Sequence, residues 1–329
     1  MTHTAPLVFA AATSRAFGER IADALGLPLG ALEERDFEDG EHKTRPLESV
    51  RDRDVYVVQS LFDQGESSVN DKLVRLLFLL ATLKDDGAAR LTAVLPYLCY
   101  ARKDRRTKDR DPITTRYVAT LLEAVGVDRV VTLDVHNLAA YQNAFRIPSE
   151  HLEARALFVE QAAGMAGEVA VVSPDVGGVK RAEAFRQSLQ RRLGRPVTAG
   201  FMEKHRSAGR VSGETLVGAV DGRKVLLLDD LIASGSTLAR AAAACRTRGA
   251  AAVTALATHG AFTSGADEAL ATPALDRVLI TDTIAAERIT RPEVLEKLMV
   301  VGTSRLFAEA IRRLNEGGSL VELVASPPL

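Results

Sequence analysis

The segment KVLLLDDLIASGST, residues 224–237, constrains the fold of this chain more than any other stretch. Residues 225–228 form a short apolar run of the length and type of a buried parallel strand. Two adjacent acids, Asp229 and Asp230, follow that run, and a loop of small residues, 233–237, comes before a helical pattern. The segment therefore predicts a strand, a loop and a helix, the repeating unit of an α/β fold.

The same segment has the chemistry of an anion site. Loop amides and a helix N-terminus can hold a phosphate, and carboxylates can accept hydrogen bonds from sugar hydroxyls or approach a metal. The alternative is a capped turn in which Ser236 or Thr237 serves as the N-cap. Two neighbouring carboxylates repel each other unless a partner compensates them, and this favours a sugar-phosphate site.

Apolar runs alternate with helical patterns along almost the whole chain. The alternation predicts an α/β architecture with mainly parallel sheets, flanked by helices, that bind ligands at the carboxyl ends of their strands. The expected strands are Leu7–Ala10, Val55–Gln59, Leu91–Leu95, Val130–Leu133, Val169–Ser173, Val225–Leu228, Ala252–Thr258 and Arg277–Ile280. The expected helices are Ser14–Leu25, Val69–Asp85, Thr114–Val125, Val179–Leu193, Leu238–Arg248 and Ser304–Asn315.

Length and composition narrow the class of protein. A chain of 329 residues suggests two domains, and the weakest patterning, near 148–153, is the expected boundary between them. The 42 basic and 43 acidic side chains give a net charge of −1, which argues against nucleic acid or an anionic membrane as a partner. The sequence shows neither a transmembrane run nor a signal peptide, and its two cysteines suit a reducing compartment, so we expect a cytoplasmic location.

Other strand ends carry groups that could take part in chemistry. Asp175 follows an expected strand, and Gly177 and Gly178 open the next helix. This arrangement suits either a cation ligand or a capped strand-to-helix turn. His136 follows Asp134 at another strand end, where a histidine is either structural or a ligand. The likeness between VVTLDVH, which contains His136, and VLLLDDL hints at two related domains.

Three polar segments complete the candidates. The basic run RKDRRTKDR, 102–110, precedes a helix expected to start at Pro112, and its guanidinium forks suit a polyphosphate better than a nucleic acid. The segment FEDGE, 37–41, places an aromatic ring beside acids on an expected loop, which is either a surface turn or a nucleoside contact. EKHR, 203–206, is either a solvated loop or a lid that brings cations to a transition state.

Taken in order, these segments resemble the motif series of ribose-phosphate diphosphokinases, the synthetases of 5-phosphoribosyl-1-diphosphate (PRPP). The segment DDLIASGST alone also resembles the PRPP motif of type I phosphoribosyltransferases. The first resemblance extends from Leu7 to about Leu314. It implies two type I phosphoribosyltransferase-like domains, 1–150 and 151–303, with the C-terminal helix, 304–329, returning to the first. It also implies transfer of the β,γ-diphosphoryl group of ATP to the anomeric hydroxyl of ribose 5-phosphate, giving PRPP and AMP.

The resemblance also implies roles for individual residues. Lys204 and Arg206 would be catalytic, and His136 and Asp175 would help to position Mg²⁺, the implied cofactor. The ATP site would contain Phe37, Asp39, Glu41, Arg102, Lys103, Asp104, Arg105 and His136. The ribose 5-phosphate site would contain Asp229, Asp230, Ser234, Gly235, Ser236 and Thr237. Members of this family are homo-oligomers built from dimers, up to hexamers, with ATP sites at subunit interfaces.

The chain departs from the family pattern at three places. Lys103 stands where many members have Gln, Ala233 stands where many have an acid, and the region 41–50 differs from the common pattern. The chain is therefore identified as a member of a divergent branch. Two alternatives are a non-catalytic regulatory subunit and a phosphoribosyltransferase that consumes PRPP. The first should have lost the loop cations or metal groups, which are present here, and the second leaves FEDGE and EKHR unexplained.

Overall fold

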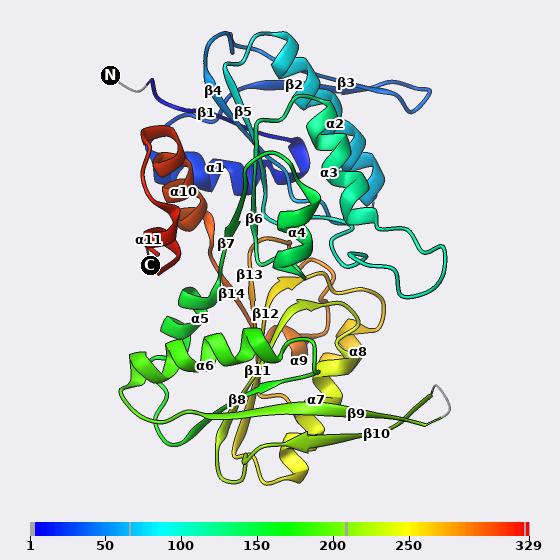
Figure 1. Cartoon of the computed structure of the whole chain (residues 1–329), viewed down its shortest axis with the longest axis vertical. Coiled ribbons are helices and arrows are strands. Elements are labelled where there is room, and N and C mark those ends of the chain that lie inside the picture. The colour runs from blue at the N-terminus through cyan, green and yellow to red at the C-terminus, as the bar shows by residue number, and fades with distance from the viewer. Residues whose placement is uncertain (1–3, 66, 208–209, 326, 329) are drawn as a thin grey trace. The chain divides into compact units, whose positions relative to one another are not determined.

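The structure is a computed structural model that describes residues 4–65, 67–207, 210–325 and 327–328, without the side chains of 204–207 and 210–214. It divides into two compact units (Figure 1). Unit 1 comprises 1–153 and 303–329, and unit 2 comprises 154–302. Among the described residues, no helix combines the length and the apolar character needed to cross a bilayer.

Unit 1 contains a five-stranded parallel sheet in the order β1-β4-β5-β6-β7. Most residues of β1, β4, β5 and β6 are buried and apolar, as expected for parallel strands covered on both faces. The strands and helices before the C-terminal segment are β1 (Leu7–Ala10), α1 (Arg15–Leu25), β2 (Leu32–Asp36), β3 (His42–Pro46), β4 (Asp54–Val58), α2 (Val69–Asp85), β5 (Arg90–Leu95), α3 (Thr114–Ala124), β6 (Arg129–Leu133), α4 (Leu138–Ala144) and β7 (Ser149–Leu152).

The end of the chain packs onto the beginning of unit 1. Helix α10 (Ser304–Glu316) lies along α1, where the rings of Phe17 and Phe307 meet edge to face with centroids 5.7 Å apart (Figure 1). Asn315 Nδ2 donates to Asp54 Oδ2 at 2.9 Å, which ties α10 to the start of β4. The last helix is α11 (Leu320–Ala325). Apolar packing and a buried polar contact therefore join sequence-distant segments in one core.

Unit 2 contains a seven-stranded sheet in the order β10-β9-β8-β11-β12-β13-β14, in which the β9–β10 pair is antiparallel and the other pairs are parallel. The two mainly parallel sheets, flanked by helices, confirm the predicted α/β class. The elements of unit 2 are α5 (Arg155–Ala162), β8 (Val169–Ser173), α6 (Val179–Leu193), β9 (Thr198–Ser207), β10 (Arg210–Val217), β11 (Lys224–Ile232), α7 (Ser236–Thr247), β12 (Ala252–Gly260), α8 (Ala266–Leu270), β13 (Arg277–Thr281), α9 (Pro292–Leu295) and β14 (Leu298–Val301).

Several boundaries differ from the sequence-based expectation, most of them by one residue. Strand β11 continues beyond Leu228 to Ile232, because its pairing with β12 runs on to Ile232 and Gly260. Helix α7 starts at Ser236 and not at Leu238. Helix α3 confirms the expected start at Thr114, whereas the expected start at Pro112 is wrong, because Ile113 has a non-helical backbone.

Candidate active site

The two adjacent acids of unit 2 lie within β11 and not after it. Asp229 pairs in register with Ala257 of β12, and the strand continues for two residues past Asp230. Successive side chains of a strand point to opposite faces, so the two carboxylates leave the backbone in opposite directions. Asp229 Oδ1 nevertheless turns back to accept a hydrogen bond from the Asp230 amide at 2.8 Å.

A cation from a neighbouring helix joins the two acids. Arg181, in the first turn of α6, places Nη1 2.9 Å from Asp230 Oδ1 and 3.6 Å from Asp229 Oδ1. Asp230 is buried, and its side chain is only 8% exposed. A cation in the first turn of a helix opposes the helix dipole, so this arginine depends on the acids for a favourable environment.

The electrostatics of the acid pair disfavour two negative charges at this place. Burial raises the pKa of Asp229 well above its usual range, and the hydrogen bonding and negative charge of Asp230 raise it further. The guanidinium of Arg181 acts in the opposite direction, but its effect is smaller. A cation or a pair of hydroxyl donors at this place would therefore relieve an existing electrostatic cost.

The small-residue loop leads directly into a helix. Gly235 is the N-cap of α7 with φ of 71°, a left-handed conformation in which a side chain would be strained. The hydroxyl oxygens of Ser234 and Ser236 lie 3.0 Å apart, and Ser236 and Thr237 are the first two helical residues. Neither is therefore the N-cap. The first amides of α7 and the positive end of its dipole face the loop, which suits a phosphate.

The turn that contains Asp175 has the hydrogen bonds of a capped strand-to-helix turn. Asp175 lies between β8 and α6, and its Oδ1 accepts from the amide of Gly178, the N-cap of α6, at 3.0 Å. Ser173 Oγ donates to the Asp175 carbonyl at 2.6 Å, which closes the turn. Because β8 pairs with β11, this turn and the acid pair lie at the same edge of one sheet.

The predicted nucleoside segment is the turn of a hairpin in unit 1. Strands β2 and β3 pair antiparallel, and Phe37 and Glu41 close the turn through an amide-to-carbonyl bond of 2.9 Å. Asp39 Oδ1 accepts from the Glu41 amide at 3.1 Å. The ring of Phe37 is 40% exposed and lies beneath the guanidinium of Arg35, whose central carbon is 5.1 Å from the ring centroid. An aromatic face is thus presented at the tip of the hairpin.

The basic segment forms the long connection between β5 and α3. Arg102 and Arg105 are exposed, while Lys103 Nζ pairs with Asp111 and donates to Thr107 Oγ1 at 3.1 Å. The hydrogen bond from Lys103 lowers the pKa of Asp111 below its usual range. The ammonium of Lys103 thus braces its own loop, and the two arginines face solvent.

One contact links this basic loop to the strand end that carries the predicted histidine. Asn137, the N-cap of α4, donates from Nδ2 to Asp104 Oδ2 at 2.6 Å. His136, the preceding residue, is exposed just beyond β6, and Asp134 begins the turn with φ of 41°. The structure therefore brings two of the predicted ATP-site segments together in unit 1.

The predicted catalytic cations lie on a strand. The backbone of Lys204 and Arg206 belongs to β9, where Lys204 pairs with Glu214 and Arg206 with Val211 of β10. Their side chains lie outside the described part of the chain. The sequence suggested a loop or lid here, whereas antiparallel pairing with β10 makes the segment one arm of a long hairpin (Figure 1).

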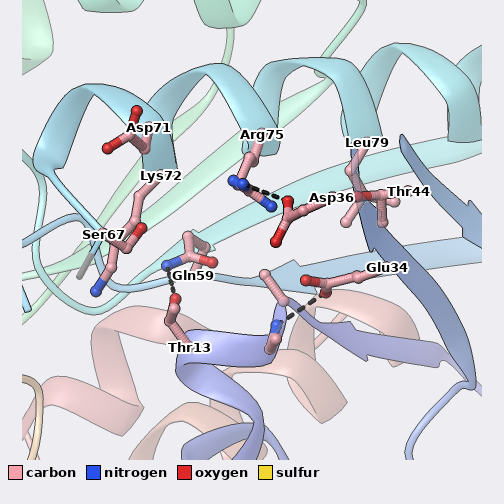
Figure 2. Close-up of a pocket in the computed structure, with 12 residues that line it drawn as sticks. Thr13, Glu34, Asp36, Thr44, Gln59, Ser67, Asp71, Lys72, Arg75 and Leu79 are labelled. Atoms are coloured by element: carbon pink, nitrogen blue, oxygen red, sulfur yellow. Dashed lines mark hydrogen bonds and ion pairs between the residues drawn. The ribbon is translucent and has the colours of Figure 1, made fainter. Parts of the chain in front are cut away.

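A separate pocket of about 370 Å³ in unit 1 contains none of the predicted site residues. Its polar groups are paired with one another: Arg75 with Asp36 at 2.5 Å, Gln59 Nε2 with Thr13 Oγ1 at 3.0 Å, and the Ala12 amide with Glu34 at 2.8 Å (Figure 2). These contacts join α2, β2 and the segment after β1. These contacts join the walls of the pocket, so the pocket is part of the structural framework of unit 1.

Comparison with known proteins shows the family to which this chain belongs. Residues 7–126 match the N-terminal domain of ribose phosphate pyrophosphokinase, and residues 202–325 match the phosphoribosyl synthetase-associated domain. A ribose-phosphate pyrophosphokinase of Caldanaerobacter subterraneus is 38% identical over 321 residues, which cover 96% of each chain. The chain belongs to the ribose-phosphate pyrophosphokinase family.

Further relatives cover the chain to the same extent. Ribose-phosphate pyrophosphokinase 1 of Streptococcus pyogenes is 35% identical over 322 residues, again 96% of both chains. The crystal structure of phosphoribosylpyrophosphate synthetase from Mycobacterium smegmatis superposes with a TM-score of 0.84 at 33% identity, covering 96% of this chain and 100% of that one. Membership of this family therefore extends over both units.

Sequence reasoning missed two residues that organise these sites. Arg181 lies in the expected helix that follows Asp175, but nothing in the sequence distinguishes it from a solvated helix cation. Asn137 is a typical N-cap, and that signal was available, but its bond to Asp104 spans 33 residues. Both roles arise from tertiary contacts.

Proposed function

We propose that this chain is a ribose-phosphate diphosphokinase. In this reaction the anomeric hydroxyl oxygen of ribose 5-phosphate attacks the β-phosphorus of ATP and loses its proton. The bond between the α,β-bridging oxygen and the β-phosphorus breaks, and PRPP and AMP result. The observation that carries the proposal is the arrangement in unit 2, where a buried acid pair, compensated by one arginine, adjoins a glycine-capped helix N-terminus. The extensive similarity to ribose-phosphate pyrophosphokinases supports it.

Unit 2 would bind the acceptor, ribose 5-phosphate. Asp229 and Asp230 would accept hydrogen bonds from the ribose hydroxyls, and these donors would favour the ionised form of both carboxyls. The 5-phosphate would lie on the loop and on the first amides of α7, with contacts from Ser234, Gly235, Ser236 and Thr237. Ala233 offers no carboxylate, so this loop would hold the sugar with one acid fewer than many relatives use.

Unit 1 would bind the donor, ATP. Arg102 and Arg105 are exposed and can contact the triphosphate, while Lys103 and Asp104 would keep their loop in shape through Asp111 and Asn137. His136 would lie near the nucleotide. Phe37 would stack on adenine, with Asp39 and Glu41 beside the nucleotide. In this proposal the hairpin serves the ATP site of a neighbouring subunit, within homo-oligomers built from dimers, up to hexamers.

Catalysis would depend mainly on positioning and on neutralisation of phosphate charge. Lys204 and Arg206 would stabilise the charge that develops on the transferred group and on the departing AMP. Mg²⁺ would supply charge neutralisation at the phosphates, with His136 and Asp175 helping to position it. Among the described residues no three His, Cys, Asp or Glu side chains gather to hold a metal. Mg²⁺ is usually bound by one or two carboxylates together with substrate phosphates, and Asp175 would supply such a carboxylate.

One coupled assay tests the proposal. Purified protein is given ribose 5-phosphate, Mg²⁺ and ATP, and the release of AMP and formation of PRPP are followed together. We expect equal amounts of both products, with no AMP when ribose 5-phosphate is left out. If no AMP forms with any nucleotide donor, at any concentration of phosphate or ADP, the result would instead favour a regulatory subunit. Consumption of PRPP without AMP formation would indicate a phosphoribosyltransferase.

A cytoplasmic location, where ATP and the sugar phosphate are available, is part of the proposal.

A further inference from the structure

Residues 262 and 263 lie far from the proposed ribose 5-phosphate loop in sequence, but they form backbone hydrogen bonds to the start of that loop. The amide of Phe262 donates to the carbonyl of Ile232 at 3.0 Å, and the amide of Thr263 donates to the carbonyl of Ala233 at 3.0 Å. These two carbonyls belong to the end of β11 and the first loop residue. Two consecutive amides thus bond two consecutive carbonyls just before Ser234.

The backbone of Phe262 is in an unusual conformation. Its φ is 42°, in the left-handed region that a bulky aromatic residue seldom adopts. The ring is buried, with 2% of the residue exposed. Such a conformation persists only where the surroundings over-determine it, and it turns the amides of residues 262 and 263 toward the same target.

Gly260 makes room for that ring. A Cβ placed on Gly260 would lie 2.6 Å from Phe262 Cε2 and 2.8 Å from Ile280 Cδ1, closer than side-chain atoms can approach. The φ of Gly260 lies outside the left-handed region, so alanine would fit its backbone and conflict only with these side chains. The glycine is therefore needed for packing, and its absence of a side chain keeps the Phe262 ring in place.

The end of β12 is itself fixed. His259 Nδ1 lies 2.8 Å from Thr283 Oγ1, and Thr281 Oγ1 donates to the Thr258 carbonyl at 2.6 Å. All four residues are buried, so these bonds lock the carboxyl end of β12 to that of β13. The segment 260–263 therefore begins at a strand end that is held in place by buried hydrogen bonds.

The two carbonyl bonds decide which way the loop amides point. A trans peptide unit is planar, and its C=O and N–H point in opposite directions. When the carbonyls of Ile232 and Ala233 are directed toward residues 262–263, the amides of Ala233 and Ser234 are directed away from them. Those are donors that a phosphate on this loop would need, and no side chain is required to aim them.

We propose that residues 260–263 form a clasp that orients the amides of the ribose 5-phosphate loop, with Phe262 as the positioning residue and Gly260 as the space it requires. The clasp contributes no atom to the ligand. It sets the affinity for the sugar phosphate by holding the loop ready before binding. This inference rests on the proposed role of the loop at Ser234–Thr237.

The decisive variant is Gly260→Ala, which adds one methyl group against the Phe262 ring. Gly164→Ala is the matched control, because Gly164 is in the same unit and has no atom within 4 Å of an added Cβ. The dissociation constant and KM for ribose 5-phosphate and the KM for ATP are measured, together with Tm. We expect ribose 5-phosphate binding to weaken at least tenfold in Gly260→Ala, with the KM for ATP within twofold and no change in Gly164→Ala.

A second pair of variants separates positioning from general stability. In Gly260→Ala combined with Phe262→Leu, the smaller side chain makes room for the methyl group, so ribose 5-phosphate should bind more tightly than to Gly260→Ala and about as tightly as to Phe262→Leu alone. If Gly260→Ala does not fold, Phe262→Leu alone is compared with Phe158→Leu, a buried phenylalanine of α5. Only Phe262→Leu should weaken ribose 5-phosphate binding, by about fivefold or more.

The outcomes distinguish this inference from the function on which it rests. If the unaltered protein binds no ribose 5-phosphate, the proposed function is wrong. A different result would overturn only the clasp. In that case the unaltered protein binds ribose 5-phosphate, Thr237→Val weakens that binding, and the clasp variants do not change it. A fall in Tm without a change in ribose 5-phosphate affinity also overturns the clasp, because a purely structural role predicts that result.

Discussion

The connection between β5 and α3 in unit 1 and the connection between β11 and α7 in unit 2 both follow the middle strand of their sheet. The strand orders are β1-β4-β5-β6-β7 and β10-β9-β8-β11-β12-β13-β14, so β5 and β11 each lie at the centre. In the order of elements along the chain β11 corresponds to β4, because each follows a strand, a helix and a two-stranded hairpin. The connection in unit 1 extends from 96 to 113, whereas that in unit 2 contains only 233 to 235.

The two connections differ in charge and burial as well as in length. The longer one carries exposed arginines, of which Arg102 and Arg105 face solvent. The shorter one carries small residues and follows two acids, and the side chain of Asp230 is only 8% exposed. Long flexible cations can follow an extended polyphosphate, whereas a short preset loop suits one compact phosphate. The connection after the middle strand is thus suited to a donor in one unit and to an acceptor in the other.

The largest expected effect comes from neither connection. If the two connections mainly bind the substrates, the acceleration of phosphoryl transfer should depend on cations of the β9–β10 hairpin. Lys204→Ala should lower kcat at least a hundredfold, since loss of one transition-state donor costs about 3–4 kcal/mol, and should leave ribose 5-phosphate binding nearly intact. Steady-state kinetics and calorimetric titration of the purified variant measure both. Near-normal turnover would remove Lys204 from the mechanism.

The next effect tests the acceptor side of the comparison. Asp230→Asn preserves shape but removes a charged acceptor and the closer carboxylate of Arg181. Hydrogen bonds to charged groups contribute about 1.5–3 kcal/mol, so the KM for ribose 5-phosphate should rise roughly 30-fold while that for ATP stays within threefold. The control is Asp276→Asn, an acid paired with Arg246 at the start of β13. Equal effects on both substrates would contradict separate sites.

The donor side should respond in the opposite sense. Arg105 is exposed on the long connection, and Arg105→Ala removes one guanidinium without disturbing the core. We expect the KM for ATP to rise about tenfold, equivalent to about 1.4 kcal/mol, with that for ribose 5-phosphate unchanged. Arg146→Ala, at a 76% exposed arginine of the same unit, serves as control. A rise in the KM for ribose 5-phosphate alone would reverse the comparison.

The sequence predicted the architecture well where burial dictates it. Strands β1 and β8 and helices α2 and α6 have the expected boundaries, because a buried apolar run or a periodic apolar face determines both the type of element and its ends. The polar hairpin strands β2, β3, β9 and β10 carry little apolar periodicity, so their pairing depends on neighbours that single-sequence patterns do not reveal. The likeness of VVTLDVH to VLLLDDL was misleading in detail, since the order of elements matches β11 with β4 and not with β6.

The candidate site was predictable as a set of residue types but not as a geometry. The acids at 229–230 and the glycine at 235 carry their chemistry in the sequence. The role of Arg181 required α6 to lie beside β11, and the role of Phe262 required β12 to end next to the loop. Contacts of this kind arise from tertiary packing, for which the sequence contains no local signal.

A smaller effect concerns stability and pH. Because the folded-state pKa of Asp229 is raised above its unfolded value, its contribution to folding is favourable below the ordinary carboxyl range and is lost as pH rises through the raised pKa. Asp229→Asn removes that loss, so the unliganded variant should be about 1 kcal/mol more stable than the original above neutral pH. Thermal unfolding between pH 5 and pH 9 should show a gain in Tm of about 2–4 °C that grows with pH. A gain that shrinks with pH would contradict the raised pKa, and activity should fall in the same variant.

The smallest effect decides whether Lys103 contacts ATP or only shapes the loop. Its ammonium is bonded to Asp111 and Thr107, so Lys103→Gln should change the KM for ATP less than threefold, well below the effect of Arg105→Ala. Loss of the hydrogen bond should raise the pKa of Asp111 toward its usual range, which NMR titration of the carboxyl carbon can follow. If the KM for ATP instead rises as much as in Arg105→Ala, Lys103 must leave Asp111 to bind the nucleotide. The long connection would then rearrange on binding, whereas the short one is set beforehand.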